Sequence, residues 1–345
     1  MSLQPHLKQI IEGRQTLTRE DARALMHLIL NGESTDLHLA AALSALATRG
    51  EAPSEIAGFA DVMRAAATPV PLDDAERNLL VDTCGTGADL SGTFNISTAA
   101  ALVAAAAGAM VAKHGNRAVT STCGSADVLE ALGIPVGLSP AEGAAALRKH
   151  RFAFFHAPDL HPAMKVVMPV RRALGIRTIF HLVGPLSNPA GASAQVMGVY
   201  AAHLVPIVAE AMSILNTRHA FVVHGTAESS DGSIKALDEI SISGPSQIAE
   251  VRNGTITLST IAPEDFGLKR ASIETLQGGN AATNAAILEA IFSGEPGPRR
   301  DIVLLNSAAV LVASDLAATL PEAITIAAHA IDTGAVTALV TSLRS

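Results

Sequence analysis

The sequence predicts an α/β protein in which a small N-terminal all-helical domain precedes a larger α/β domain with a mostly parallel central sheet. Helix signals fill the first 68 residues, and no strand pattern occurs there. From about residue 78, short apolar runs alternate with helical segments, a pattern typical of α/β folds. Between the two regions, residues 68–71 contain two prolines and predict an extended linker.

Three helices are predicted before this linker. Thr18 begins a capping box ahead of a helix over residues 22–30, which Gly32 ends. A second helix is expected over residues 38–48 and a third over 53–67, where a proline occupies the first helical position. Residues 1–70 are therefore predicted to form the helical domain.

The remaining chain predicts strands alternating with helices, then a hairpin and a helical end. Apolar runs that predict strands lie at residues 79–82, 110–113, 152–155, 195–199 and 219–223. The helices between and after them are expected at 97–107, 126–132, 140–149, 203–215, 281–292, 301–313 and 321–343. Arg252-Asn-Gly between two apolar runs predicts a hairpin of strands 248–251 and 255–261.

Residues 79–108 combine a strand, a glycine turn and the start of a helix. The turn contains Gly85, Gly87 and Gly92, and Asn95, Ser97 and Thr98 open an Ala-rich helix. Glycines allow a ligand to approach the backbone closely, and the free N–H groups of a helix start favour anions. The spacing matches neither the Rossmann nor the P-loop pattern. An ordinary capped helix is the alternative interpretation.

A second polar loop follows the next strand. It contains two cations, an imidazole and small polar groups, namely Lys113, His114, Asn116, Arg117 and Ser121. Ser125, which follows the loop, is a candidate helix cap. Because ligands of open α/β sheets bind at the carboxyl ends of the strands, two such loops in succession favour one anion site. The alternative is a surface loop that is merely polar.

Composition and charge narrow the class of function. A net charge of −8 disfavours broad nucleic-acid binding. Two cysteines cannot form a disulfide framework or a zinc site. The first 13 residues are too polar for a signal peptide, and the longest apolar run, at 99–110, is too short to cross a bilayer. We therefore expect a cytoplasmic protein without nucleic-acid or membrane partners.

Four motifs in order resemble the anthranilate phosphoribosyltransferase family. They are GTGAD at 85–89, NIST at 95–98, KHGNR at 113–117 followed by GSADVLEALG, and HPAMK at 161–165 with the arginine- and proline-rich segment after it. The resemblance covers essentially the whole chain. It implies transfer of the phosphoribosyl group of 5-phosphoribosyl 1-pyrophosphate to the amine of anthranilate, in tryptophan biosynthesis, with Mg²⁺ as cofactor.

The same resemblance implies a nucleoside phosphorylase/phosphoribosyltransferase-like architecture and a homodimer. The segment at about 162–190 would join the helical domain in space, and residues 71–161 and 191–345 would form the α/β domain. It implies a donor site made of Gly85, Ala88, Asp89, Thr93, Asn95, Ser97, Thr98, Lys113, His114, Gly115, Asn116, Arg117, Ser121 and Ser125.

The family match also implies the acceptor and metal sites. Anthranilate would contact Gly85, Asn116, His161 and Arg171, and Mg²⁺ would be bound by Ser97, Asp238 and Glu239. A guanidinium such as that of Arg171 suits the two oxygens of a carboxylate. No acid or base catalyst is expected, although His114 could line the reaction centre.

Three departures and three alternatives accompany this interpretation. Ala88 stands where the family often has glycine, and His181 stands where it usually has asparagine. Between His224 and Glu239 the chain is longer than is usual in the family, which affects the loop that carries the expected metal ligands. A protein of the same fold could use another aromatic amine, or a pyrimidine nucleoside. A non-catalytic relative that binds nucleic acid is the third alternative, and the net charge argues against it.

Overall fold

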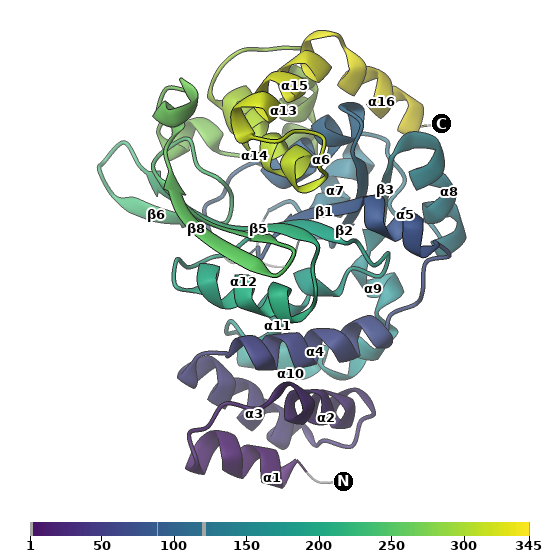
Figure 1. Cartoon of the computed structure of the whole chain (residues 1–345), viewed down its shortest axis with the longest axis vertical. Helices are drawn as coiled ribbons and strands as arrows, with labels where there is room; N and C mark the ends of the chain where they lie inside the picture. Colours follow the sequence, from purple (N-terminus) through teal and green to yellow (C-terminus); the bar gives the residue numbers. More distant parts are fainter. Residues whose placement is uncertain (1–2, 88, 119–121, 345) are drawn as a thin grey trace.

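A sheet lies at the centre of the computed structural model, which describes residues 3–87, 89–118 and 122–344 (Figure 1). Its order is β3-β2-β1-β4-β5-β7-β8, with β6 paired to the far end of β5. Strands β1 to β5 are parallel, whereas β6, β7 and β8 are antiparallel to their neighbours. The bounds are β1 (Leu80–Gly85), β2 (Met110–Gly115), β3 (Phe152–His156), β4 (Ala194–Gly198), β5 (His219–Glu228), β6 (Ile234–Leu237), β7 (Ser246–Arg252) and β8 (Thr255–Ile261).

Both faces of the parallel strands are buried, which explains why these strands are apolar without alternation. Val81 and Val111 contact the core on one face, and Leu80 and Ala112 contact a second core on the other. The first core lies under helices α6 (Ile96–Ala106), α7 (Ser125–Ala131), α13 (Ala281–Phe292), α14 (Pro298–Ala313), α15 (Leu320–Asp332) and α16 (Ala335–Leu343). The opposite face is covered by α8 (Pro140–His150) near β3 and by α12 (Leu204–Ile214) near β5.

The N-terminal helices lie beyond α12 (Figure 1). They are α1 (Gln4–Leu7), η1 (Lys8–Glu12), α2 (Arg19–Leu30), α3 (Asp36–Arg49) and α4 (Pro53–Ala65). A later segment packs among them through η2 (Pro162–Val166), α10 (Met168–Leu174), α11 (Phe180–Val183) and η3 (Pro185–Ser187), and α9 (Ala157–Leu160) connects it to β3. Val170, Phe180 and Leu186 share one core with Phe59 of α4. The fold class is confirmed, and the exact domain limits stay a prediction.

Three expectations about elements are corrected. Leu79, expected in a strand, ends helix α5 (Asp74–Leu79) and is 60% exposed. The helix expected over 321–343 divides into α15 and α16 because Gly334 between them has φ +75°. The long segment after His224 is not an irregular loop: β5 continues to Glu228 and turns back as β6. Two short helices, η4 (Pro263–Phe266) and η5 (Ile273–Leu276), connect β8 to α13.

Within the described ranges, no single helix is both long and apolar enough to span a bilayer. Helices α15 and α16, which are bent by 65° relative to each other, reach the necessary length and apolar composition only when they are taken together.

Candidate active site

Two glycines at neighbouring strand ends make room for an acidic pair. Gly85 ends β1, Gly198 ends β4, and the two are aligned in the sheet. A Cβ on Gly198 would lie 1.6 Å from the carbonyl oxygen of Asp238, and a Cβ on Gly85 would lie 2.5 Å from the Oδ2 atom of the same aspartate. The backbone leaving β6 therefore crosses the carboxyl ends of β1 and β4, and it brings Asp238 and Glu239 to this edge.

Asp238 is held by the glycine turn after β1. Its Oδ2 accepts hydrogen bonds from the backbone N–H of Gly87 at 2.7 Å and from the hydroxyl of Thr86 at 3.2 Å. Its own N–H donates to the carboxylate of Asp89 at 3.3 Å. Burial, with the nearby carboxylates of Asp89 and Glu239, raises the pKa of Asp238 well above its usual value. The turn thus donates to a carboxyl group of the protein itself, and its binding of a ligand anion stays a prediction.

Glu239 faces the start of α6. Its Oε1 accepts the backbone N–H of Ser97 at 3.0 Å, a free donor of the first helical turn. Burial raises the pKa of Glu239 to about 8, although the nearby Lys113 lowers it. The Lys113 ammonium donates to the Thr83 carbonyl at 2.6 Å and to the Ser97 hydroxyl at 3.4 Å, and burial lowers its pKa.

The chemistry of this group fits a hard divalent cation. The carboxylates of Asp238 and Glu239 and the hydroxyl of Ser97 are oxygen ligands of the kind that Mg²⁺ prefers. The raised pKa values of Asp238 and Glu239 reflect buried acidic groups close together, which a bound cation would stabilise in the charged form. Among the described residues, no cluster of three or more His, Cys, Asp or Glu side chains forms a complete metal site. Substrate oxygens or water would therefore have to complete the coordination.

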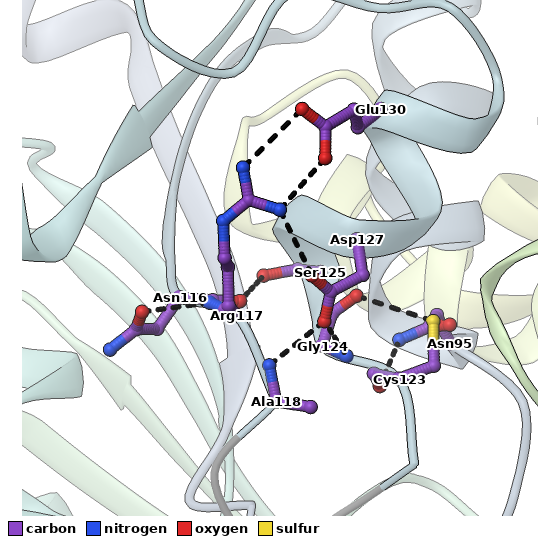
Figure 2. A network of polar contacts seen from close by, with 9 residues as sticks. All are labelled: Asn95, Asn116, Arg117, Ala118, Cys123, Gly124, Ser125, Asp127 and Glu130. Carbon is purple, nitrogen blue, oxygen red and sulfur yellow. Dashed lines mark hydrogen bonds and ion pairs between the residues drawn. The ribbon is translucent and has the colours of Figure 1, made fainter.

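The loop after β2 is organised by Asp127 (Figure 2). Its carboxylate accepts the N–H groups of Ala118 at 2.9 Å and of Gly124 at 2.8 Å. Arg117 pairs with Glu130 at 2.7 Å and with Asp127 at 3.2 Å, so its guanidinium lies along α7. Ser125 is the first residue of α7 and not its cap, and its hydroxyl donates to the Asn116 carbonyl at 3.3 Å. The loop is polar and internally bonded.

Asn95 links the two loops. It precedes α6 but makes no capping hydrogen bond. Its Nδ2 donates to the Cys123 carbonyl at 3.1 Å, and its Oδ1 accepts from Asn284 of α13 at 2.8 Å. Asn95 therefore occupies the N-cap position of α6 without a capping side-chain bond, because Asn284 and the second loop bind its side chain. The contact holds the glycine turn and the second loop side by side.

His114 and His161 form a buried pair near the end of β2. Their ring centroids are 5.1 Å apart, and neither Nε2 has a hydrogen-bond partner among the described residues. Burial lowers the pKa of His114 to about 3, with a further contribution from His161, and lowers the pKa of His161 to about 4. Both imidazoles are neutral near pH 7 and present unpaired nitrogens. This structure thus brings together two residues expected at the reaction centre.

These lowered pKa values predict a dependence of stability on pH. The unfolded histidines take up protons below about pH 6.5, whereas the folded ones do not, so stability falls as the pH is lowered through this range. At pH 5 we expect a loss of about 2 kcal/mol for each histidine. Urea unfolding at pH 5 and 7.5 measures the difference in the free energy of unfolding between the two pH values. His161→Asn should reduce this difference, while replacing the exposed His203 with asparagine should not. Equal differences in all three proteins would contradict this assignment.

Arg171 lies apart from the strand ends, on α10. Its guanidinium lies 5.3 Å from the ring centroid of Phe180 and contacts Met168. No carboxylate of the described ranges forms an ion pair with it, and burial lowers its pKa. Arg171 is thus a half-buried cation without a counter-ion among the described residues, and its role in binding an acidic ligand stays a prediction.

The remaining expected residues differ in how far the structure describes them. Thr98 is buried with an unpartnered hydroxyl, Thr93 contacts Ser91, and a Cβ on Gly115 would collide with Ser125. Ala88 and Ser121 lie outside the described residues.

Sequence reasoning missed Asp82 as part of this region. Its carboxylate accepts the N–H of His114 at 3.2 Å and the amide of Asn188 at 2.9 Å. The sequence signal that could have identified Asp82 is the presence of an acidic residue in a strand that is otherwise apolar.

Comparisons with known proteins agree with this geometry. Residues 4–67 match the helical bundle domain of the glycosyl transferase family, and residues 77–337 match its a/b domain. The chain is 51% identical to an anthranilate phosphoribosyltransferase of Symbiobacterium thermophilum over 95% of this chain and 93% of that protein. It is 49% identical to one of Solibacter usitatus over 99% and 98%.

Solved structures give the same result. The crystal structure of anthranilate phosphoribosyltransferase from Thermus thermophilus is similar with a TM-score of 0.88 and 40% identity, covering 98% of each chain. The enzyme of Saccharomyces cerevisiae in complex with phosphoribosyl pyrophosphate and Mg has a TM-score of 0.83 and 25% identity, over 99% of this chain and 96% of that one. By sequence and by fold, this chain belongs to the anthranilate phosphoribosyltransferase family.

Proposed function

We propose that this protein transfers the phosphoribosyl group of 5-phosphoribosyl 1-pyrophosphate to the amine of anthranilate, forming N-(5-phosphoribosyl)anthranilate and pyrophosphate. The observation that carries the proposal is the convergence of a backbone anion site, two buried carboxylates and the Lys113 ammonium at one sheet edge. These groups suit a metal-bound pyrophosphate. The similarity to the anthranilate phosphoribosyltransferases supports the same reaction.

We propose that the donor is bound by the two loops that follow β1 and β2. The residues assigned to it are those named from the sequence: Gly85, Ala88, Asp89, Thr93, Asn95, Ser97, Thr98, Lys113, His114, Gly115, Asn116, Arg117, Ser121 and Ser125. Gly87 and the first turn of α6 offer N–H donors that the carboxylates of Asp238 and Glu239 accept here. Donor phosphates would compete for these N–H groups. Arg117 and Ser125 contribute through the shape of the second loop.

The mechanism rests on binding and electrostatics. Breaking the bond at the ribose C1 develops oxocarbenium character, as in glycoside chemistry. A bound Mg²⁺, held by Asp238, Glu239 and Ser97, would supply charge neutralisation for the departing pyrophosphate. Lys113 adds a buried positive charge beside the same carboxylates. The anthranilate nitrogen carries its own lone pair, so no strong base is needed, and positioning supplies the remaining rate enhancement.

We propose that anthranilate lies between the strand ends and α10. Arg171 would bind its carboxylate, and His161, Asn116 and Gly85 would border it. The neutral imidazoles of His114 and His161 place unpaired nitrogens at this boundary without adding positive charge near the developing cation.

A single assay tests the reaction. Purified protein is mixed with phosphoribosyl pyrophosphate, anthranilate and Mg²⁺, and consumption of anthranilate is followed through its loss of fluorescence. The proposal predicts turnover that requires all three components. Parallel reactions with a neutral aromatic amine, and with thymidine plus phosphate, separate the alternative acceptors and the nucleoside reaction. Turnover of thymidine alone would overturn the proposal.

Replacing Arg171 with alanine is expected to weaken use of the acceptor selectively. Loss of a charge-assisted hydrogen bond of about 1.5–3 kcal/mol predicts a rise of about 10- to 100-fold in the KM for anthranilate. The KM for the donor should stay unchanged. Arg172→Ala, an exposed neighbour on the same helix, is the matched control. Equal anthranilate kinetics in the two variants would remove Arg171 from the acceptor site.

We further propose a cytoplasmic homodimer. Cys84 and Cys123 are both free thiols, in keeping with a reducing compartment. Leu37 on α3 is 83% exposed, and a contact with a second copy would bury it. Light scattering measures the molar mass of the wild type and of Leu37→Lys. The wild type should have the mass of a dimer and the variant should dissociate more readily, whereas a monomeric wild type would contradict the proposal.

A further inference from the structure

A cavity of about 340 Å³ lies where the helical segment meets the sheet, and it is separate from the strand ends described above. Its walls come from the end of α4, the linker after it, helix α5, η3 and β4. Ala65, Ala67, Pro69, Pro189 and Ala192 supply apolar surface. Because α5 precedes β1, Arg77 reaches the cavity from the amino end of that strand, opposite to the acidic pair.

Two arginines from different parts of the fold line this cavity. Arg64, in the last turn of α4, donates through Nε to the Leu186 carbonyl at 2.7 Å. Within the described part of the chain, its two terminal nitrogens donate to no protein acceptor and it forms no ion pair. Asp61, whose charge raises the pKa of Arg64, is itself paired with Arg19 at 2.7 Å. Burial lowers the pKa of Arg64, which reflects a cation removed from water.

The second cation is Arg77. It donates to the carbonyls of Ala190 at 2.6 Å and Val70 at 2.9 Å, which fix the guanidinium against the cavity wall. In the described ranges it has no carboxylate partner either. Two cations without counter-ions that border one small, partly apolar space are an unfavourable arrangement until an anion binds between them.

One acidic residue also borders the cavity. Asp82 would repel an anion, but both of its oxygens already accept hydrogen bonds, from Asn188 at 2.9 Å and from the His114 N–H at 3.2 Å. Burial raises its pKa to about 6. The amide of Gln195 donates to the Pro185 carbonyl at 2.8 Å. The cavity is thus lined by two positive charges and one negative charge, and the nearby Lys113, which lowers the pKa of Asp82, partly offsets that negative charge.

We propose that this cavity is a binding site for a small organic oxyanion, a carboxylate or a phosphate, held between Arg64 and Arg77. The volume suits a small molecule and not a nucleotide chain or a peptide. The anion would contact α4 of the helical segment and α5 at the entrance to the sheet. Its binding would therefore tie the two parts of the fold together. The proposal does not depend on the proposed reaction.

Binding is measured by calorimetry on the full chain, with benzoate and inorganic phosphate as separate probes. At least one probe should bind, and Arg64→Met and Arg77→Met should each weaken it about tenfold or more, which corresponds to about 1.4 kcal/mol. Arg172→Met, an exposed arginine elsewhere, should leave binding unchanged. Preference for benzoate identifies a carboxylate site, and preference for phosphate identifies a phosphate site.

Three further variants keep the outcome decisive. Ala67→Phe fills the cavity while both arginines stay, and it should abolish binding even if the arginine variants fold poorly. Arg171→Ala and Lys113→Met report on anion binding in the proposed active site. No binding of either probe at about 10 mM would overturn the proposal, since that concentration detects a Kd in the millimolar range. Binding lost in Arg171→Ala or Lys113→Met but kept in Ala67→Phe would overturn it too.

Discussion

Replacing Gly198 with alanine is expected to reduce kcat/KM about 100-fold while leaving the protein folded. The added Cβ would lie 1.6 Å from the Asp238 carbonyl oxygen and 2.3 Å from its carbonyl carbon, so the backbone of Asp238 must move. Both acidic side chains move with it. A displacement of about 1 Å in a catalytic group costs about 100-fold in rate.

The matched control is Gly137→Ala, where an added Cβ meets no atom within 4 Å. It should retain wild-type kinetics. Circular dichroism and thermal melting check the fold of both variants, because overpacking at Gly198 costs about 1–3 kcal/mol of stability. Gly85→Ala should have a smaller effect than Gly198→Ala, since the three atoms nearest to its Cβ belong to the Asp238 carboxylate, which can rotate, and not to backbone. Wild-type activity in Gly198→Ala would show that the position of Asp238 does not matter.

The strand-end loops were predictable from local sequence. Gly85 and Gly87 come within a few residues of a short apolar run, and a helix with polar opening residues follows them. A strand, turn and helix in this order place free N–H groups at the carboxyl edge of a sheet. The structure confirms the mostly parallel sheet and places the two successive loops after the adjacent strands β1 and β2.

Long-range contacts were not predictable in the same way. Nothing in the local sequence shows that Asn284, far along the chain, occupies the Asn95 side chain, or that Glu130 occupies Arg117. The role of Gly198 also depends on register, because only its alignment with Gly85 opens the space that Asp238 uses. The motifs themselves were enough to identify the family, while the partners of each side chain required the fold.

The segment between His224 and Glu239 shows why chain length alone was a poor guide. Its extra residues extend β5 and return as β6, in register from Gly225 opposite Leu237 to Glu228 opposite Ile234. The added length therefore projects beyond the sheet, and the residues that follow β6 stay at the strand ends. An insertion inside a hairpin changes its reach without displacing its base, which is where the expected metal ligands lie.

Replacing the acidic pair should abolish most Mg²⁺-dependent activity without weakening the fold. In Asp238→Asn with Glu239→Gln, neutral amides replace the two carboxylates that suit a hard cation. We expect a loss of about 100- to 1,000-fold in kcat/KM at fixed Mg²⁺, equivalent to about 3–4 kcal/mol. The amide oxygens can still accept the N–H groups of Gly87 and Ser97.

Stability and activity should therefore move in opposite directions in this double variant. Burial, with the neighbouring carboxylates, raises the pKa values of both acidic groups, so keeping them charged costs stability, and neutral amides carry no such cost. The thermal midpoint should be equal to or above that of the wild type, while Mg²⁺ binding, measured by calorimetry in the presence of the donor, is lost. Glu228→Gln, an exposed acid at the end of β5, is the control and should change neither property. Full activity with normal Mg²⁺ dependence in the double variant would remove Asp238 and Glu239 from the metal site.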